Sequence, residues 1–188
     1  MSASDPLSLA ALLTPETCIA APHAATIRGL VHQLLGLPRR AGAVLNEQQL
    51  VEDFSELGLF ERREEFPRGG RPYEELESGR ACGVTLVDDW QVLYGESETL
   101  EEPIVCFARF PEGTSVGAAT QMKGANFILL LLTPPGARRR ALQLITRLVR
   151  LKRRWDDGGG RALFEAQSEE ELCAVFLQAE QQLMGPPQ

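Results

Sequence analysis

Hydrophobic residues recur at helical spacing in several segments of the chain. Between His23 and Leu35 the apolar positions are three or four residues apart, which predicts an amphipathic helix that ends at Gly36 and Pro38. A second, acidic helix is predicted to begin after the N-cap residue Asn46 and to stop at Gly58. The same spacing predicts two later helices, over residues 138–154 and 168–183, the latter opened by a capping box at Ser168–Glu171.

Between these helical patterns lie runs of β-branched and aromatic residues bounded by Gly, Pro and Asp, which are typical of strands. They are Val84–Val87, Val92–Tyr94, Ile104–Phe110 and Phe127–Thr133, with a further short strand at Cys18–Ala21. Phe127–Leu132 is apolar at every position, which predicts a central strand covered on both faces. Helices before, between and after the strands predict an α/β layered domain.

The length of 188 residues predicts a single domain that spans residues 1–188. Residues 61–80 contain turn formers and charges with little apolar periodicity, and we interpret them as a long surface loop. Phe127–Leu132, six residues long, falls far short of the roughly 20 residues that cross a bilayer. The chain begins without a secretory signal, so we expect a cytoplasmic protein.

Charge is distributed unevenly along the chain. With 19 Lys and Arg against 26 Asp and Glu, the formal net charge of −7 argues against a nucleic-acid binder. No acidic residue lies between Glu112 and Asp156, so a basic helix stands on an otherwise anionic body and could attract an acidic protein segment, a small anion or an anionic membrane surface. The candidate binding residues are Arg138, Arg139, Arg140, Arg147, Arg150, Lys152, Arg153 and Arg154.

The positions of these residues suggest two uses. Arg147, Arg150 and Arg154 share one helix face, which Arg140 extends, and this face lies away from the apolar stripe. Cations in the first helical turn oppose the helix dipole, and Arg138–Arg140 beside the N–H groups of Gly136–Ala137 could hold an anion. The alternative is a solvated face whose arginines pair with acidic loops of the same domain, such as Glu61–Glu65.

Few residues can support catalysis. His23 and His32 are nine residues apart on the predicted helix, about 13 Å along its axis and half a turn around it, so they cannot meet at one site. The four cysteines are widely spaced and form no zinc or redox motif, which predicts reduced, buried thiols. No phosphate loop, dinucleotide motif or hydrolase elbow occurs, and we expect neither a metal nor a cofactor.

Several segments, taken in their order and spacing, resemble the phosphotransferase-system enzyme IIA domain of the mannitol/fructose type. They also resemble its eukaryotic relative, the cytoplasmic domain of band 3 and other bicarbonate transporters. The resemblance covers residues 7–183 and implies a mixed, mostly parallel sheet of about five strands sandwiched between helices. The segments that carry it are Leu12–Ile19, the helix from His23, Leu100–Gly113, Phe127–Gly136 and Ala166–Leu172.

The resemblance implies two different positions for the active segment. Enzyme IIA relatives carry phosphate on a histidine in a segment like Ile-Ala-Ile-Pro-His-Ala, and Ile19–Ala24 looks similar, with His23 as the candidate phosphorylation site. Matching the elements in order places the active segment at Gly79–Trp90 instead, where no histidine stands, and a second family histidine would fall near Arg138. The resulting degenerate active-site region contains Arg80, Cys82, Asp88 and Asp89.

Band 3-type domains also lack both histidines, and the sequence resembles that branch more closely. The resemblance therefore implies a non-catalytic regulatory or protein-docking domain at the cytoplasmic face of a membrane, associated with an anion transporter of the bicarbonate type and not itself an enzyme. Its partner would be the transporter, another protein or an anionic membrane surface, with a homodimer left open. The alternatives are a phosphocarrier of the enzyme IIA type that uses His23, or a free-standing anion-sensing signalling domain.

Overall fold

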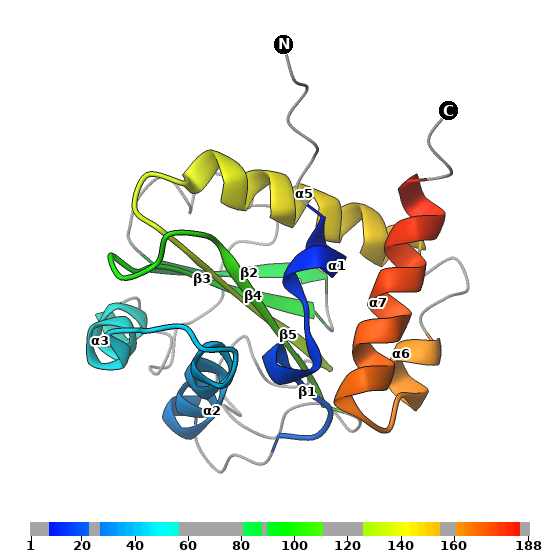
Figure 1. Ribbon diagram of the computed structural model, residues 1–188, viewed down its shortest axis with the longest axis horizontal. Coiled ribbons are helices and arrows are strands. Elements are labelled where there is room, and N and C mark those ends of the chain that lie inside the picture. Colours follow the sequence, from blue (N-terminus) through cyan, green and yellow to red (C-terminus); the bar gives the residue numbers. More distant parts are fainter. Residues whose placement is uncertain are drawn as a thin grey trace.

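Helices lie on both faces of a single sheet, as Figure 1 shows. The structure is a computed structural model, and it describes residues 8–22, 27–56, 81–87, 90–110, 126–154 and 161–184. The strands are β1 (Cys18–Ile19), β2 (Ala81–Val87), β3 (Trp90–Glu96), β4 (Ile104–Arg109) and β5 (Phe127–Thr133). The helices are α1 (Leu9–Leu12), the short η1 (Pro15–Thr17), α2 (Ile27–Arg40), α3 (Glu47–Glu56), α5 (Arg138–Arg154), α6 (Arg161–Glu165) and α7 (Glu169–Met184). The α/β class predicted from the sequence is confirmed.

The sheet is mixed, with the strand order β1-β4-β5-β3-β2. β1 with β4 and β3 with β5 pair in parallel, whereas β4 with β5 and β2 with β3 pair antiparallel. Five strands in a mixed sheet agree with the expectation, but parallel pairs do not predominate. One reason lies at the edge of the sheet: β2 ends at Val87 and β3 begins at Trp90, and so short a connection permits only antiparallel pairing.

The central strand of the sheet is β5, as predicted, and all seven of its residues are buried. Phe127, Leu129 and Leu131 face the core under α1, α5, α6 and α7. Ile128, Leu130 and Leu132 face a second core under α2 and α3. The uninterrupted apolar run is thus explained by two buried faces.

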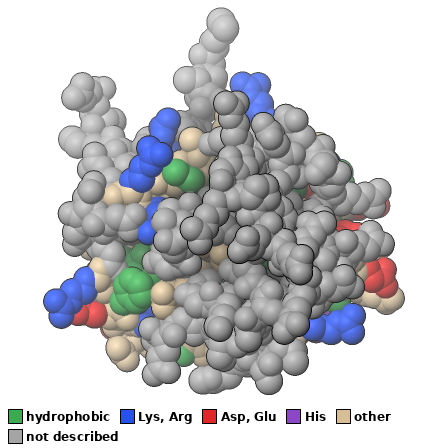
Figure 2. Space-filling view, turned by 180° about the vertical axis from the view of Figure 1, so that it is seen from behind, with side chains coloured by type: hydrophobic (Ala, Val, Ile, Leu, Met, Phe, Trp, Pro, Cys, Tyr) green, Lys and Arg blue, Asp and Glu red, His purple; other side chains and the backbone are tan. Residues whose placement is uncertain are grey.

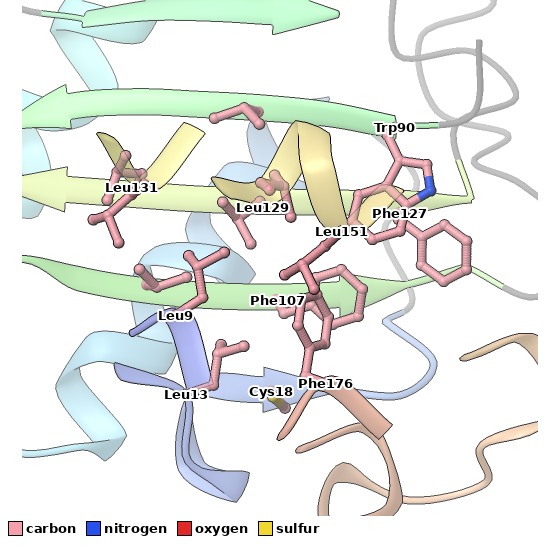
Figure 3. Close-up of a cluster of buried hydrophobic side chains, with 14 of the residues drawn as sticks. Leu9, Leu13, Cys18, Trp90, Phe107, Phe127, Leu129, Leu131, Leu151 and Phe176 are labelled. Atoms are coloured by element: carbon pink, nitrogen blue, oxygen red, sulfur yellow. The ribbon is translucent and has the colours of Figure 1, made fainter. Parts of the chain in front are cut away.

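Four aromatic side chains form a cluster at one end of the sheet: Trp90, Phe107, Phe127 and Phe176 (Figure 3). The ring centroids of Trp90 and Phe127 are 4.8 Å apart, and those of Phe107 and Phe176 are 4.5 Å apart in an edge-on arrangement. Such pairs contribute about 0.5–1.5 kcal/mol each beyond the burial of their area. This aromatic cluster joins β3, β4 and β5 to α7.

Helix α2 continues to Arg40, so the predicted end at Gly36 and Pro38 is wrong. Leu37 is 1% exposed and adds to the core under α2, which favours a further helical turn. Arg40 then donates from Nη2 to the carbonyl of Cys18 at 3.0 Å, which ties this turn to β1. Burial and a long-range hydrogen bond therefore outweigh the helix-breaking tendency of Pro38.

The predicted helix starts at Asn46 and Ser168 are confirmed by their side-chain hydrogen bonds. Asn46 Oδ1 accepts from the N–H of Gln49 at 3.2 Å, and Ser168 Oγ accepts from the N–H of Glu171 at 3.2 Å. The carboxylate of Glu171 reaches back to the N–H of Gln167 at 2.6 Å, one residue before the cap. The predicted surface loop over 61–80 lies outside the described residues, and the single-domain interpretation stays a prediction.

Candidate functional site at the carboxyl edge of β3 and β5

Parallel strands β3 and β5 end together at one edge of the sheet. Glu96 is the register partner of Thr133, and the N–H of Ser97 donates to the carbonyl of Thr133 at 2.9 Å. The chain leaves β5 through a turn in which Gly136 has a φ of 80°, a conformation that favours glycine, and then enters α5. In open α/β sheets, ligands bind in the crevice outside the carboxyl ends of the strands.

Four polar side chains meet at this edge, and we call them the carboxyl-edge cluster: Tyr94, Glu96, Thr133 and Arg138. Tyr94 Oη donates to Glu96 Oε1 at 2.8 Å and lies 3.1 Å from Thr133 Oγ1. Arg138 Nε donates to the same Glu96 oxygen at 3.0 Å. Tyr94 and Glu96 are two residues apart on one strand, so both side chains point toward the face covered by α5, where Arg138 opens the helix.

Burial decreases across this cluster from the sheet to its surface. Tyr94 and Thr133 are fully buried, the Glu96 side chain is 10% exposed, and that of Arg138 is 41% exposed. Burial raises the pKa of Tyr94 to about 12, and the Glu96 carboxylate adds to this rise, while the hydrogen bond with Thr133 opposes it. The phenol therefore remains a hydrogen-bond donor at neutral pH and holds Glu96 in place for Arg138.

A rim of exposed charges surrounds the cluster; we define the carboxyl rim as residues 97–102 and 134–140. Glu98, Glu101 and Glu102 are exposed on the connection between β3 and β4, and Arg139 is exposed at the start of α5. Arg140 Nη1 pairs with Glu102 Oε2 at 2.5 Å, linking the two halves of the rim. Because both signs of charge are present, the rim suits a polar protein surface better than a purely anionic ligand.

The basic helix predicted from the sequence is α5, but its charges are largely engaged within the domain. Arg138 pairs with Glu96 and Arg140 with Glu102. Arg147 pairs with Glu180 of α7, and its side chain is only 12% exposed. The predicted exposed face is therefore wrong for Arg147, because α7 covers this part of α5.

The remaining basic residues of α5 differ in their exposure to solvent. Lys152 is 4% exposed, so it is buried in the domain and does not face the solvent. Arg139, Arg150 and Arg153 are exposed, and the side chain of Arg154 lies outside the described part of the chain. On the face that Figure 2 shows, the coloured Lys and Arg side chains of the protein lie at separate places.

The predicted anion cradle at the start of α5 is engaged in part within the domain. The N–H of Ala137 donates to the carbonyl of Pro134 at 3.2 Å within the turn, which leaves it unable to serve an anion. Arg138 and Arg140, which oppose the helix dipole in the first turn, are stabilised by the carboxylates of Glu96 and Glu102. These ion pairs supply the reason for arginines at this unfavourable position.

Histidine does not join the carboxyl-edge cluster in the described part of the chain. There, His32 is the single imidazole; it is exposed on α2, which packs on the opposite face of the sheet. His23, Arg80, Asp88 and Asp89 lie outside the described residues.

Of the predicted degenerate region, the structure places the backbone of Cys82, which is the register partner of Tyr94 on β2. Cys82 thus belongs to a strand beside the cluster. Within the described ranges, no group of His, Cys, Asp and Glu side chains could hold a metal ion.

Sequence reasoning missed Tyr94, Glu96 and Thr133. One signal was available, because Tyr94 and Glu96 alternate at the end of a predicted strand and Thr133 ends another. Recognising the cluster further requires that these strands are parallel neighbours in register, which the patterns alone do not specify.

Two solved structures share this fold over most of their length. The nitrogen regulatory protein IIA-Ntr from Neisseria meningitidis is similar with a TM-score of 0.63 and 16% identity, covering 89% of this chain and 98% of that one. The IIA mannitol protein from Escherichia coli is similar with a TM-score of 0.58 and 16% identity, covering 87% and 98%.

The sequence comparisons found no match. No family model matches the sequence, and neither does any curated protein. None of the helices in the described ranges is long and apolar enough to span a bilayer. The enzyme IIA-like fold expected from the sequence is confirmed, while the likeness to the band 3 domain remains a prediction.

Proposed function

We propose that the chain is a regulatory, protein-docking domain of the enzyme IIA type that does not itself carry a phosphoryl group. The observation that carries this proposal is the Glu96–Arg138 ion pair at the carboxyl edge of β3 and β5. A phosphohistidine carrier needs an imidazole at its site. The described groups at this edge are instead a carboxylate, a guanidinium, a phenol and a hydroxyl, which already bind one another. The name of IIA-Ntr, a nitrogen regulatory protein, supports a regulatory role for this fold.

The carboxyl rim is the docking surface in this proposal. Its exposed residues, Glu98, Glu101 and Arg139, surround a site held rigid from within by Tyr94 and Thr133. A rigid surface loses little conformational entropy on binding. The partner class predicted from the sequence is an anion transporter of the bicarbonate type.

Binding to vesicles tests the docking surface. We would compare vesicles that carry a bicarbonate-type transporter with empty vesicles of the same anionic lipids. The double variant Glu101→Lys with Arg139→Glu should weaken binding to the transporter vesicles about tenfold. The matched control Arg153→Glu changes an exposed arginine outside the rim and should bind like the parent. Equal binding to loaded and empty vesicles would favour a lipid surface and contradict transporter docking.

A phosphocarrier that uses His23 is the second candidate, and the fold shared with two IIA proteins favours it. It predicts uptake of one phosphate from phosphoenolpyruvate in the presence of enzyme I and the histidine phosphocarrier protein. The uptake should disappear in His23→Ala and persist in His32→Ala, whose imidazole lies on the opposite face of the sheet from the carboxyl-edge cluster. That pair of results would replace the docking proposal.

A further inference from the structure

Two cysteines that are far apart in the sequence lie side by side between β1 and α7. The Sγ atoms of Cys18 and Cys173 are 3.3 Å apart, although 155 positions separate the residues. Both are free thiols. A disulfide bond is about 2.05 Å long, so the two sulfurs need to approach by little more than about 1 Å.

The surroundings of the two thiols differ. Cys18 is fully buried in the core beneath α7, in the same group of side chains as Phe176 (Figure 3). Cys173 is partly exposed on α7, which departs from the expectation that the cysteines are buried. A reagent from solution therefore reaches Cys173 before Cys18.

We propose that Cys18 and Cys173 form a peroxide-sensitive redox pair, in which Cys173 is oxidised first and Cys18 resolves it into a disulfide. This proposal is independent of the docking function, because neither cysteine belongs to the carboxyl rim. It goes beyond the sequence prediction of reduced, buried thiols, which rested on the wide spacing of the cysteines along the chain.

Electrostatics supports this order of reaction. The hydrogen bond with the Cys18 thiol lowers the pKa of Cys173, while burial and the carboxylates of Glu16 and Glu170 oppose this effect. The same hydrogen bond, with burial, raises the pKa of Cys18. Thiolates are the reactive form of cysteine, so Cys173 is the better nucleophile toward peroxide.

The chemistry balances in two steps. The Cys173 thiolate attacks one oxygen of hydrogen peroxide, the O–O bond breaks, and Cys173 sulfenic acid and hydroxide form. Cys18 Sγ then attacks the Cys173 sulfur, the S–O bond breaks, and the disulfide forms as water leaves with the Cys18 proton. Peroxide is the oxidant in this sequence, and a dithiol such as dithiothreitol reverses it by exchange. The product ties an edge strand of the sheet to α7.

Peptide mapping gives a direct test. The folded protein is treated with hydrogen peroxide, its remaining thiols are alkylated in denaturant, and trypsin is added. Cleavage after Lys and Arg leaves Cys18 in peptide 1–28, Cys173 in peptide 162–188, and the other two cysteines together in peptide 81–109. We expect most of the protein to contain peptides 1–28 and 162–188 joined by a disulfide, and dithiothreitol to release both.

Three variants assign the roles of the two cysteines. Cys173→Ser should abolish the link and leave Cys18 reduced, whereas Cys18→Ala should leave a sulfenic acid at Cys173 that dimedone captures. Cys106→Ser is the matched control, because Cys106 is buried in the core under α2 and α3; it should form the link like the parent.

Several results would contradict the proposed redox pair. They are the absence of the 1–28 to 162–188 link in the parent, dimedone capture at Cys18 in Cys173→Ser, or a link that joins two chains in a mixture of isotope-labelled and unlabelled protein. Should Cys18→Ala fail to fold, the mapping of the parent and of Cys173→Ser still decides the question.

Discussion

The two ends of strands β3 and β5 have opposite chemistry. At their beginning, Trp90 and Phe127 are 2% and 1% exposed and lie in the aromatic cluster. At their carboxyl end, Glu96 and Thr133 belong to the hydrogen-bonded carboxyl-edge cluster, which opens to solvent through Arg138, whose side chain is 41% exposed. The same two strands therefore have a buried apolar end and a polar end that reaches the surface.

This difference separates residues that stabilise the fold from residues that are available for function. Aromatic packing stabilises a domain directly. A partly buried ion pair contributes little relative to apolar residues of similar size, because desolvation offsets the attraction of its charges. Apolar residues of similar size would stabilise this end of the sheet as well as Glu96 and Arg138 do, which is why we assign the docking surface there.

Leu130→Asp should unfold the domain and so disrupt both ends of the strands. Leu130 is 1% exposed at the centre of β5, and an unpaired carboxylate there costs several kcal/mol against a total stability of roughly 5–15 kcal/mol. We expect the variant to lose its cooperative thermal transition in circular dichroism. Val44→Asp, at a side chain that is 73% exposed, is the control and should melt like the parent. If Leu130→Asp melts normally, β5 is not the central strand.

Phe107→Ala should damage the aromatic end alone. Phe107 is fully buried and contacts Trp90, Phe127 and Phe176, so its truncation should cost about 3–5 kcal/mol in urea unfolding. The ionisation of Tyr94, followed by absorbance in the alkaline range, should stay unchanged. A shifted Tyr94 titration would show that the two ends are coupled, contrary to the comparison.

Charge reversal on α5 separates cations that serve the fold from exposed ones. Arg147→Glu breaks the pair with the buried Glu180 and should cost about 2–4 kcal/mol, less than for a fully buried pair because the Arg147 side chain keeps 12% exposure. Arg150→Glu, at an exposed position, should stay within about 0.5 kcal/mol of the parent. We expect neither change to alter binding to anionic liposomes. Normal melting of Arg147→Glu, or a marked loss of liposome binding in either variant, would support the basic binding surface that was predicted from the sequence.

Tyr94→Phe should act chiefly at alkaline pH. The pKa of Tyr94 is raised from 10.0 to about 12, so between these values the folded protein binds a proton that the unfolded chain has lost. The stability contributed by the neutral phenol is complete below pH 10 and declines as pH rises toward 12, by up to about 1.4 kcal/mol per pH unit. The free energy of unfolding, measured from pH 10 to pH 12, should decline less steeply with pH for Tyr94→Phe than for the parent. Equal slopes would mean that the phenol is not held neutral by burial.

Much of the fold could be predicted because it depends on local patterns. The apolar run of β5 and the stripe of α5 specify their own burial, and Asn46 and Ser168 mark helix starts through hydrogen bonds to nearby N–H groups. The end of α2 could not be predicted locally, because the hydrogen bond from Arg40 to Cys18 joins residues 22 positions apart.

The candidate site depends on contacts of this second kind. Tyr94 meets Thr133 across 39 positions, and Arg138 meets Glu96 across 42. Only the parallel register of β3 with β5 brings these residues together. A strand that is buried on both faces also lacks the alternation of apolar and polar residues that would show which way each side chain points. The charge of α5 was visible in the sequence, but its pairing partners were not.

Phosphate uptake tests the central claim most directly. The protein is incubated with phosphoenolpyruvate, enzyme I and the histidine phosphocarrier protein, and its intact mass is recorded at neutral pH, where phosphohistidine survives, beside a known enzyme IIA as the positive control. We predict that the mass of this chain stays unchanged while the control gains one phosphate. A gain of one phosphate by this chain, at a rate similar to that of the control, would contradict a docking domain that carries no phosphoryl group.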